Sequence, residues 1–168
     1  MVRARSHVIA LLVLLPGLAC NQIVGIEAPV DEAPPVALAT GPAAFVGRWR
    51  SDAPPPRDHL TQCRASADFA FNGTYTFDLV DLGNGQVKGT NADSPACQIT
   101  LSTSGAVGTL VAPSSCTFSA SLTITYNAAT FTLSAAGVGV LELGGDARVP
   151  DDACKYDGRF TLRRLASP

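Results

Sequence analysis

The chain has 168 residues, of which only 15% are charged, and its formal net charge is −2. Residues 20–168 carry ten basic and fourteen acidic side chains, which gives that part a net charge of −4. This acidic balance argues against a nucleic-acid-binding protein, which needs a basic surface, and against a polybasic contact with anionic lipid. The length fits one domain with a tail.

Residues 1–19 have the pattern of an export signal. Arg3 and Arg5 give a basic start, and residues 8–18 form an apolar run of eleven residues. A run of this length suits a signal peptide and is shorter than the roughly 20 apolar residues that a membrane-spanning helix needs. We therefore expect residues 1–19 to be a signal helix that is removed when the protein is exported.

The apolar run ends in the sequence Gly17-Leu18-Ala19-Cys20. It resembles the lipobox of bacterial lipoproteins, whose usual form is Leu-Ala/Ser-Gly/Ala-Cys. The resemblance implies that Cys20 becomes the first residue of the mature protein and carries fatty acyl chains such as palmitate. Several acyl chains make attachment to a membrane durable. Asn21 stands where an aspartate retains lipoproteins of enteric bacteria in the inner membrane, so the resemblance favours the outer membrane.

Residues 20–44 are rich in proline and alanine. Proline favours the extended polyproline II conformation and cannot donate a backbone hydrogen bond. We therefore expect a semi-rigid, extended tether that holds the following domain away from the bilayer. The alternative is that the apolar residues within 23–26 pack against that domain.

Residues 45–168 show the pattern of an all-β domain. Apolar and polar residues alternate at period two in segments such as 75–79 and 122–126, as they do in half-buried strands. The predicted strands are 45–51, 68–71, 74–81, 86–91, 97–103, 106–112, 117–126, 130–136, 138–143 and 156–165. Turn signals separate them, among them residues 127–129 and 144–146. Short, closely spaced strands indicate an antiparallel up-and-down barrel or a β-sandwich.

The five cysteines are an odd number for an exported protein. Acylation of Cys20 would leave Cys63, Cys97, Cys116 and Cys154, which allow three disulfide pairings. Geometry favours Cys97–Cys116, because these residues flank one predicted hairpin. It also favours Cys63–Cys154, because they follow the first strand and precede the last, which pair in a closed barrel. No Cys-x-x-Cys spacing suggests a redox or zinc site.

Residues 45–49 read Phe-Val-Gly-Arg-Trp and open the first predicted strand. Gly-x-Trp at this place resembles the first-strand signature of the lipocalins. The resemblance implies an eight-stranded barrel, one end of which is closed by Trp49 under an arginine of the last strand. The last predicted strand carries Arg159, Arg163 and Arg164. We predict Gly47, Trp49 and Arg163 as the barrel-closing residues, with a cation–π contact on the indole.

Catalytic and metal-binding motifs are weak in this sequence. His59 is the one histidine after residue 20 and lies on a predicted loop flanked by proline, and no Gly-x-Ser-x-Gly motif is present. Asp146, Asp151 and Asp152 gather on another predicted loop without EF-hand spacing. We therefore predict no enzyme, no metal and no cofactor. Glu142 is expected to face outward, and the alternative is an inward carboxylate that anchors a ligand.

Two functions remain open from the sequence. The first is a membrane-anchored protein of the cell envelope, monomeric, whose lipocalin-like barrel binds a small apolar ligand. The alternative is a structural or interaction lipoprotein with a filled core that docks envelope partners. A continuous apolar cavity of roughly 300 Å³ or more would favour the first. Solid packing of the side chains expected to point inward would exclude a ligand. These inward residues are Tyr75, Phe77, Leu79, Leu122, Ile124, Phe131 and Leu133.

Overall fold

The computed structural model describes residues 40–135 and 137–166. The expected signal peptide, Cys20 and most of the tether lie outside the described residues. The described part contains α2 (Pro42–Phe45), β1 (Gly47–Ser51), β2 (Arg57–Thr61), β3 (Phe69–Ala70), β4 (Thr76–Gly83), β5 (Gln86–Asn91), β6 (Ser94–Ser104), β7 (Val107–Leu110), β8 (Ser114–Ser119), β9 (Leu122–Ala135), β10 (Val138–Val149) and β11 (Asp152–Arg164). No helix within this part is long and apolar enough to cross a membrane.

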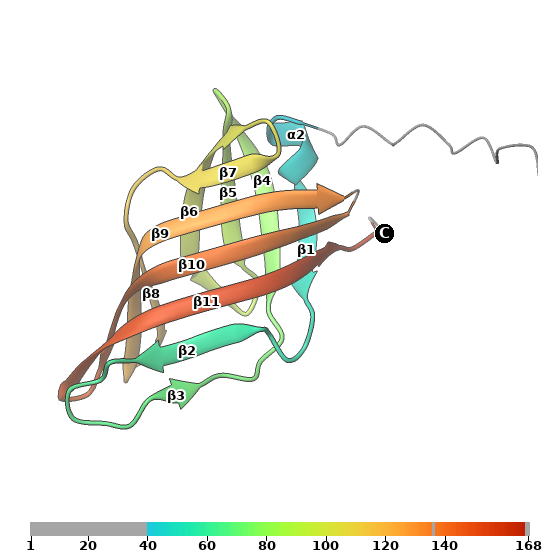
Figure 1. Ribbon diagram of the computed structural model, residues 1–168. Helices are drawn as coiled ribbons and strands as arrows, with labels where there is room; N and C mark the ends of the chain where they lie inside the picture. The colour runs from blue at the N-terminus through green and yellow to red at the C-terminus, as the bar shows by residue number, and fades with distance from the viewer. Residues whose placement is uncertain (1–39, 136, 167–168) are drawn as a thin grey trace, which may run out of the picture. The chain divides into compact units, whose positions relative to one another are not determined.

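Eight of the strands close into an antiparallel barrel (Figure 1). Their order is β1-β4-β5-β6-β7-β9-β10-β11, and β1 pairs with β11 to complete the ring, with Trp49 opposite Arg164. The all-β prediction is confirmed, and of its two alternatives the chain forms the barrel and not the sandwich. Where the eight strands pair around the ring, each has a neighbour on both sides, so closure removes the free edges that an open sheet would have there.

The long strands β9, β10 and β11 extend beyond the closed ring, and β9 and β11 pair there with additional short strands. The first half of β9 pairs with β8 at residues 114–119, and the first half of β11 pairs with β2 at residues 57–61. β3 then pairs with β2 and forms the outer edge. Figure 1 shows these additions at the end of the barrel away from α2. We call the two ends the closed end, beside α2, and the open end.

Both expected disulfide bonds are present, and both lie toward the open end. Cys97–Cys116 joins β6 to β8, and Cys63–Cys154 joins the segment after β2 to β11. The two bridges close loops with sequence separations of 19 and 91. On the chain-entropy model such loops stabilise the fold by about 3 and about 4.5 kcal/mol. The open end is therefore fixed covalently on both of its sides.

A β-bulge in β9 changes which residues face the barrel interior. Ile124 and Tyr126 are buried on its first half, whereas Ala129 and Phe131 are buried on its second half. Tyr126 pairs with Gly145 of β10, and Ala128 pairs with the neighbouring Gly144. Asn127 therefore has no partner on β10 and is the extra residue of the bulge. A bulge inserts one residue on one strand and increases local bending and twist. The bend lets β9 leave the closed ring and reach the open end.

Several local predictions are wrong, among them a single strand over residues 117–126, which the structure divides between β8 and β9. Residues 127–129 lie inside β9, where Asn127 is the bulged residue, and residues 144–146 lie inside β10, so the polar and glycine-rich stretches bend strands without ending them. Residues 57–61 form β2, although a loop was predicted around His59. The domain also begins before residue 45, because α2 packs Ala44 and Phe45 into the core and Gly41 donates a hydrogen bond to the carbonyl of Gly105.

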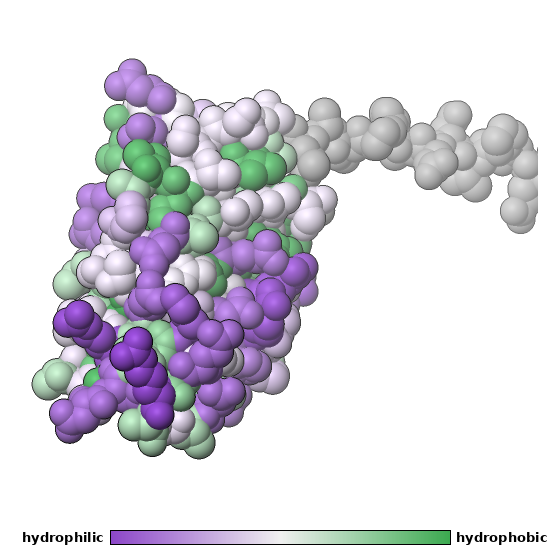
Figure 2. Space-filling view, turned by 60° about the vertical axis from the view of Figure 1, so that its left-hand side comes forward, coloured by the Kyte–Doolittle hydropathy of each residue, from purple (hydrophilic) through white to green (hydrophobic). Residues whose placement is uncertain are grey.

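The outer surface is mostly neutral and polar. Cross-strand ion pairs lie on it at Arg48–Asp78 (3.0 Å), Glu142–Arg159 (2.6 Å) and Asp146–Lys155 (2.5 Å). Figure 2 shows polar groups over the lower part of one face, with apolar groups in separate areas above them. Exposed ion pairs of this kind each contribute little to stability. Glu142 lies opposite Arg159 in the pairing of β10 with β11 and forms an ion pair with it, so Glu142 faces outward, as expected.

Candidate functional site

The closed section of the barrel is filled by side chains. Phe131 is 1% exposed and packs its ring edge-on against Phe45 at 5.5 Å and Trp49 at 5.1 Å between ring centroids. The space that remains is about 10 Å³ and is lined by Phe77, Leu79, Gly89, Ile99, Leu101, Phe131, Leu141 and Leu162. That volume is at the lower limit for a single water molecule. The barrel axis at this level therefore has no room for a ligand.

The closed end is sealed around Trp49, which donates its indole N–H to the carbonyl of Phe45 at 2.7 Å. The guanidinium of Arg164 lies 5.1 Å from the centre of the indole and donates to the carbonyls of Ala44 and Val46. Gly47 has a φ of 134°, and a side chain there would meet Arg164. The prediction of Gly47 and Trp49 at this end therefore agrees with the structure.

The prediction of Arg163 as the closing arginine is wrong. Leu162 points inward on β11, so the period-two pattern turns the next residue outward and returns Arg164 to the inner side. Arg163 lies on the outer face and pairs with Asp52 through two hydrogen bonds of 2.9 and 3.1 Å. The alternation of the apolar residues Phe160 and Leu162 in the sequence already indicates Arg164 and not Arg163 for the inner side.

Two pockets lie at the open end. The inner pocket has a volume of about 160 Å³ and is lined by Asp58, Phe71, Tyr75, Phe118, Leu122, Ile124 and Tyr156. The outer pocket has a volume of about 370 Å³ and is lined by Leu60, Cys63, Ser66, Ala67, Phe69, Phe71, Ser121, Leu122, Val149 and Pro150. Phe71 and Leu122 belong to both linings, so the pockets adjoin. Both linings are mainly apolar.

The inner pocket is assembled from elements far apart in the sequence. Asp58 comes from β2, Tyr156 from β11 and Ile124 from β9, while Tyr75 lies in the connection that leads into β4. The additions to the barrel therefore build this site, since β2 and β8 pair with the extended halves of β11 and β9. Of the inward residues considered from the sequence, those of the closed section pack solidly, whereas Tyr75, Leu122 and Ile124 line this pocket.

Asp58 is the one polar group of the inner pocket that carries a formal charge. Its side chain is 2% exposed. The hydroxyl of Tyr75 donates to Oδ2 at 2.6 Å, and the hydroxyl of Tyr156 donates to Oδ1 at 3.0 Å. Asp58 takes part in none of the ion pairs found among the described residues. The carboxylate is thus held by two neutral donors within a mainly apolar wall.

Burial controls the protonation of this cluster. It raises the pKa of the Asp58 carboxyl above its ordinary value, and the hydrogen bonds from Tyr75 and Tyr156 act in the opposite direction. Burial also raises the pKa of Tyr75, Tyr126 and Tyr156, and the nearby Asp58 carboxylate adds to this effect. The three tyrosines therefore remain neutral hydrogen-bond donors at neutral pH.

Gly158 makes room for this hydrogen-bond arrangement. It lies opposite Asp58 in the pairing of β11 with β2. A Cβ atom at position 158 would lie 2.6 Å from the hydroxyl oxygen of Tyr156 and 2.8 Å from the ring of Phe160. The missing side chain therefore lets the Tyr156 hydroxyl reach the carboxylate.

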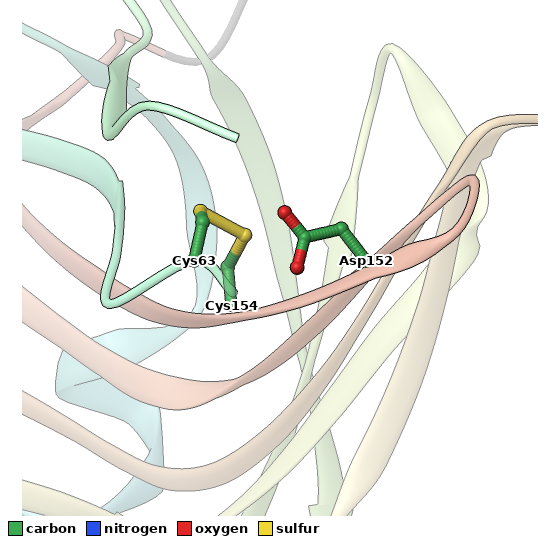
Figure 3. A group of neighbouring side chains, drawn as sticks. All are labelled: Cys63, Asp152 and Cys154. Carbon is green, nitrogen blue, oxygen red and sulfur yellow. A yellow bond between two sulfur atoms is a disulfide. The ribbon is translucent and has the colours of Figure 1, made fainter. Parts of the chain in front are cut away.

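A second group of potential ligand atoms, shown in Figure 3, is a structural feature and not a metal site. Cys63, Asp152 and Cys154 place their sulfur and oxygen atoms within 4.8 Å of one another. The two sulfurs form a disulfide bond, so neither is a thiolate that could bind a metal. The Asp152 carboxylate accepts hydrogen bonds from the backbone of Arg64, Ala65 and Ser66 at 2.8–3.1 Å. The Ser66 hydroxyl donates a further bond of 2.6 Å, which contributes most to lowering the pKa of the Asp152 carboxyl, and together these bonds fix the segment after β2.

Other residues considered from the sequence are dispersed. His59 is half-buried on β2 and not on a loop. Asp146 pairs with Lys155 and Asn127 on the outer surface, whereas Asp152 binds the segment after β2, so the acidic residues do not converge. Glu142 pairs with Arg159 outside the barrel.

Sequence reasoning missed Asp58. Prolines at 54–56 precede it and indicated a loop, and the alternation of Asp58 with Leu60 is too short to predict a strand on its own. The chain has three tyrosines, and two of them bind Asp58. Comparison with protein-family models, curated proteins and solved structures finds no match for this chain.

Proposed function

We propose that this protein is exported, is anchored to a bacterial membrane through lipid on Cys20, and binds a small apolar ligand at the open end of its barrel. The observation that carries the binding role is the pair of adjoining apolar pockets next to a filled barrel interior. Ligand sites are usually concave, mainly apolar and equipped with a few convergent polar groups. The inner pocket with Asp58 meets this description.

The anchoring part of the proposal rests on the lipobox resemblance and on the cysteines. Four of the five cysteines form the two disulfide bonds, which leaves Cys20 over. Disulfides form and persist mainly in oxidising compartments outside the cytosol. Both points support export with acylation of the remaining cysteine, and Asn21 supports the outer membrane as the destination.

The second candidate function is an interaction lipoprotein that docks envelope partners. The solid packing around Phe131 in the closed section favours it, because a filled barrel can serve as a rigid scaffold. On this alternative the exposed Phe69 on the edge strand β3 would belong to the contact surface. We prefer ligand binding because the open-end pockets also hold a buried carboxylate, which a docking surface does not need.

The anchoring claim is tested by mass spectrometry of the full-length protein extracted from membranes. We expect a chain that begins at Cys20, carries a diacylglyceryl group and an N-acyl chain, and contains two disulfide bonds. A chain with an unmodified Cys20 would contradict the anchor. A small molecule that is released on denaturation would support the binding role and would identify the ligand.

A further inference from the structure

The inner pocket combines a short apolar chamber with one buried carboxylate, and this combination points to a class of ligand. Apolar protein cavities of about 150 Å³ hold a single benzene ring. A volume of about 160 Å³ therefore admits one ring or a short alkyl chain. The wall supplies this tail with the rings of Phe71 and Phe118 and the side chains of Leu122 and Ile124.

We propose that the inner pocket binds a ligand that carries a protonated amine on a short apolar tail, with the amine held against the Asp58 carboxylate. The proposal rests on the binding role described above and names its ligand class. An ammonium group has three donors and no acceptor, and an ionised carboxylate only accepts. The two groups are therefore complementary in charge and in hydrogen bonding.

The carboxylate oxygens of Asp58 have hydrogen-bonding capacity left for the amine. Each oxygen of an ionised carboxylate can accept about two hydrogen bonds. Oδ1 accepts one from Tyr156 and Oδ2 accepts one from Tyr75. The two hydroxyls orient the carboxylate before the ligand arrives, so the ordering of the acceptor does not have to occur on binding. Asp58 also contributes to the pocket wall.

Other head groups fit this pocket less well. A ligand carboxylate or phosphate would bring a second negative charge beside Asp58 in a site of low polarity, which is unfavourable. A neutral alcohol would form a hydrogen bond without compensating the buried charge. Among the described residues Asp58 lacks a partner in an ion pair, so a ligand cation would supply the missing charge.

The test compares three six-carbon probes that differ in the head group: hexylamine, hexan-1-ol and hexanoate. Each is titrated by calorimetry into the full-length protein in phosphatidylcholine nanodiscs, and the heat of protein-free discs is subtracted. A hydrogen bond to a charged group contributes about 1.5–3 kcal/mol. We therefore expect hexylamine to bind at least about tenfold more tightly than hexan-1-ol, and hexanoate to bind most weakly.

Two variants assign the preference to Asp58. Asp58→Asn keeps the shape and removes the charge, and we expect the ratio of amine to alcohol affinity to fall below about threefold. Asp157→Asn removes the same charge next to Gly158 on β11, where Asp157 pairs with Arg57 at the surface, and we expect it to keep the ratio. A folded Asp58→Asn variant that kept the preference would overturn the proposal.

The wild-type protein decides the question even if Asp58→Asn does not fold. Equal affinities for the three probes would overturn the amine proposal and leave the binding role intact. If none of the three probes bound, the binding role itself would fail. The two failures are thus distinguishable in one set of titrations.

Discussion

Asp58 and its two tyrosines show how a buried charge is accommodated at this open end. An unpaired carboxylate in an apolar site loses much of its hydration, and this loss raises its pKa. The hydroxyls of Tyr75 and Tyr156 restore part of what water would supply. The carboxylate is therefore tolerated in the folded protein, at a cost that depends on pH.

Stability should depend on pH through Asp58 in a defined direction. Its folded pKa lies above the ordinary value of 3.8, so the folded state holds this proton more tightly than the unfolded state does. The contribution of Asp58 to the free energy of unfolding is therefore fully present below pH 4, and it is lost as the pH rises through the folded pKa of Asp58. We predict that the stability difference between wild type and Asp58→Asn shifts against wild type as pH rises from 4 to 7.

Denaturant unfolding at several pH values with the disulfides intact measures this difference. Asp146 and Asp152, whose pKa values are lowered, act in the opposite direction. Both are present in both proteins, so their contributions cancel in the comparison. A difference that stayed constant across this range, or that moved in favour of wild type, would show that the Asp58 carboxyl is not perturbed as described.

The arginines of β11 show what sequence could predict at this scale. The resemblance of Gly-x-Trp to the lipocalin signature, together with a terminal cluster of arginines, implied a sealed end around Trp49. Which arginine reaches the indole depends on strand register, and adjacent residues of a strand face opposite sides. Arg163 and Arg164 have the same chemistry, and the signal that separates them is the alternation of the apolar residues Phe160 and Leu162, which continues to position 164.

At the scale of elements, the bulge in β9 separates the closed section from the open end. Gly145 on β10 lies opposite the bulge, and a Cβ atom there would lie 2.1 Å from the carbonyl oxygen of Thr125. Its neighbour Gly144 has ordinary space, with the Cβ of Ala128 at 3.8 Å. The two adjacent glycines therefore form a natural pair for comparison.

We predict that Gly145→Ala lowers the free energy of unfolding by about 1–3 kcal/mol, as forced overpacking does. Gly144→Ala should change it by less than about 1 kcal/mol, because alanine in a strand is not worse than glycine where space allows. Thermal or denaturant unfolding measures both. Equal effects of the two substitutions would contradict the close approach at the bulge.

The same region explains why the predicted strand boundaries were wrong. Asn127-Ala128-Ala129 and Gly144-Gly145-Asp146 have turn composition, and short-range pattern does not distinguish a turn from a bulge between long strands. The pairing of β9 with β10 runs through both segments and makes them parts of strands. This pairing joins residues far apart in the chain, so a short sequence pattern does not reveal it. By contrast, period-two segments such as 75–79 and 156–165 predicted their strands well, because one face of each is buried.

At the scale of the whole molecule, the two ends of the barrel differ in how they are packed. The closed section is a packed scaffold sealed by Phe45, Trp49 and Phe131. The open end is built from short added strands fixed by Cys97–Cys116 and Cys63–Cys154. The cysteine spacing and the closed-barrel hypothesis were enough to predict both pairings. The site itself was not predictable, since it forms where β2, β9 and β11 meet.

The central claim is that a ligand binds at the open end of the barrel, and substitutions that fill its pockets test this most directly. We would measure hexan-1-ol affinity by calorimetry for wild type, Leu122→Trp and Leu82→Trp in phosphatidylcholine nanodiscs. Leu122 lines both pockets, so the larger indole should fill them, whereas Leu82 is exposed on β4 and is absent from both linings. We predict that Leu122→Trp weakens binding at least about tenfold and that Leu82→Trp leaves it unchanged. Wild-type affinity in Leu122→Trp, or no binding to wild type, would contradict the account.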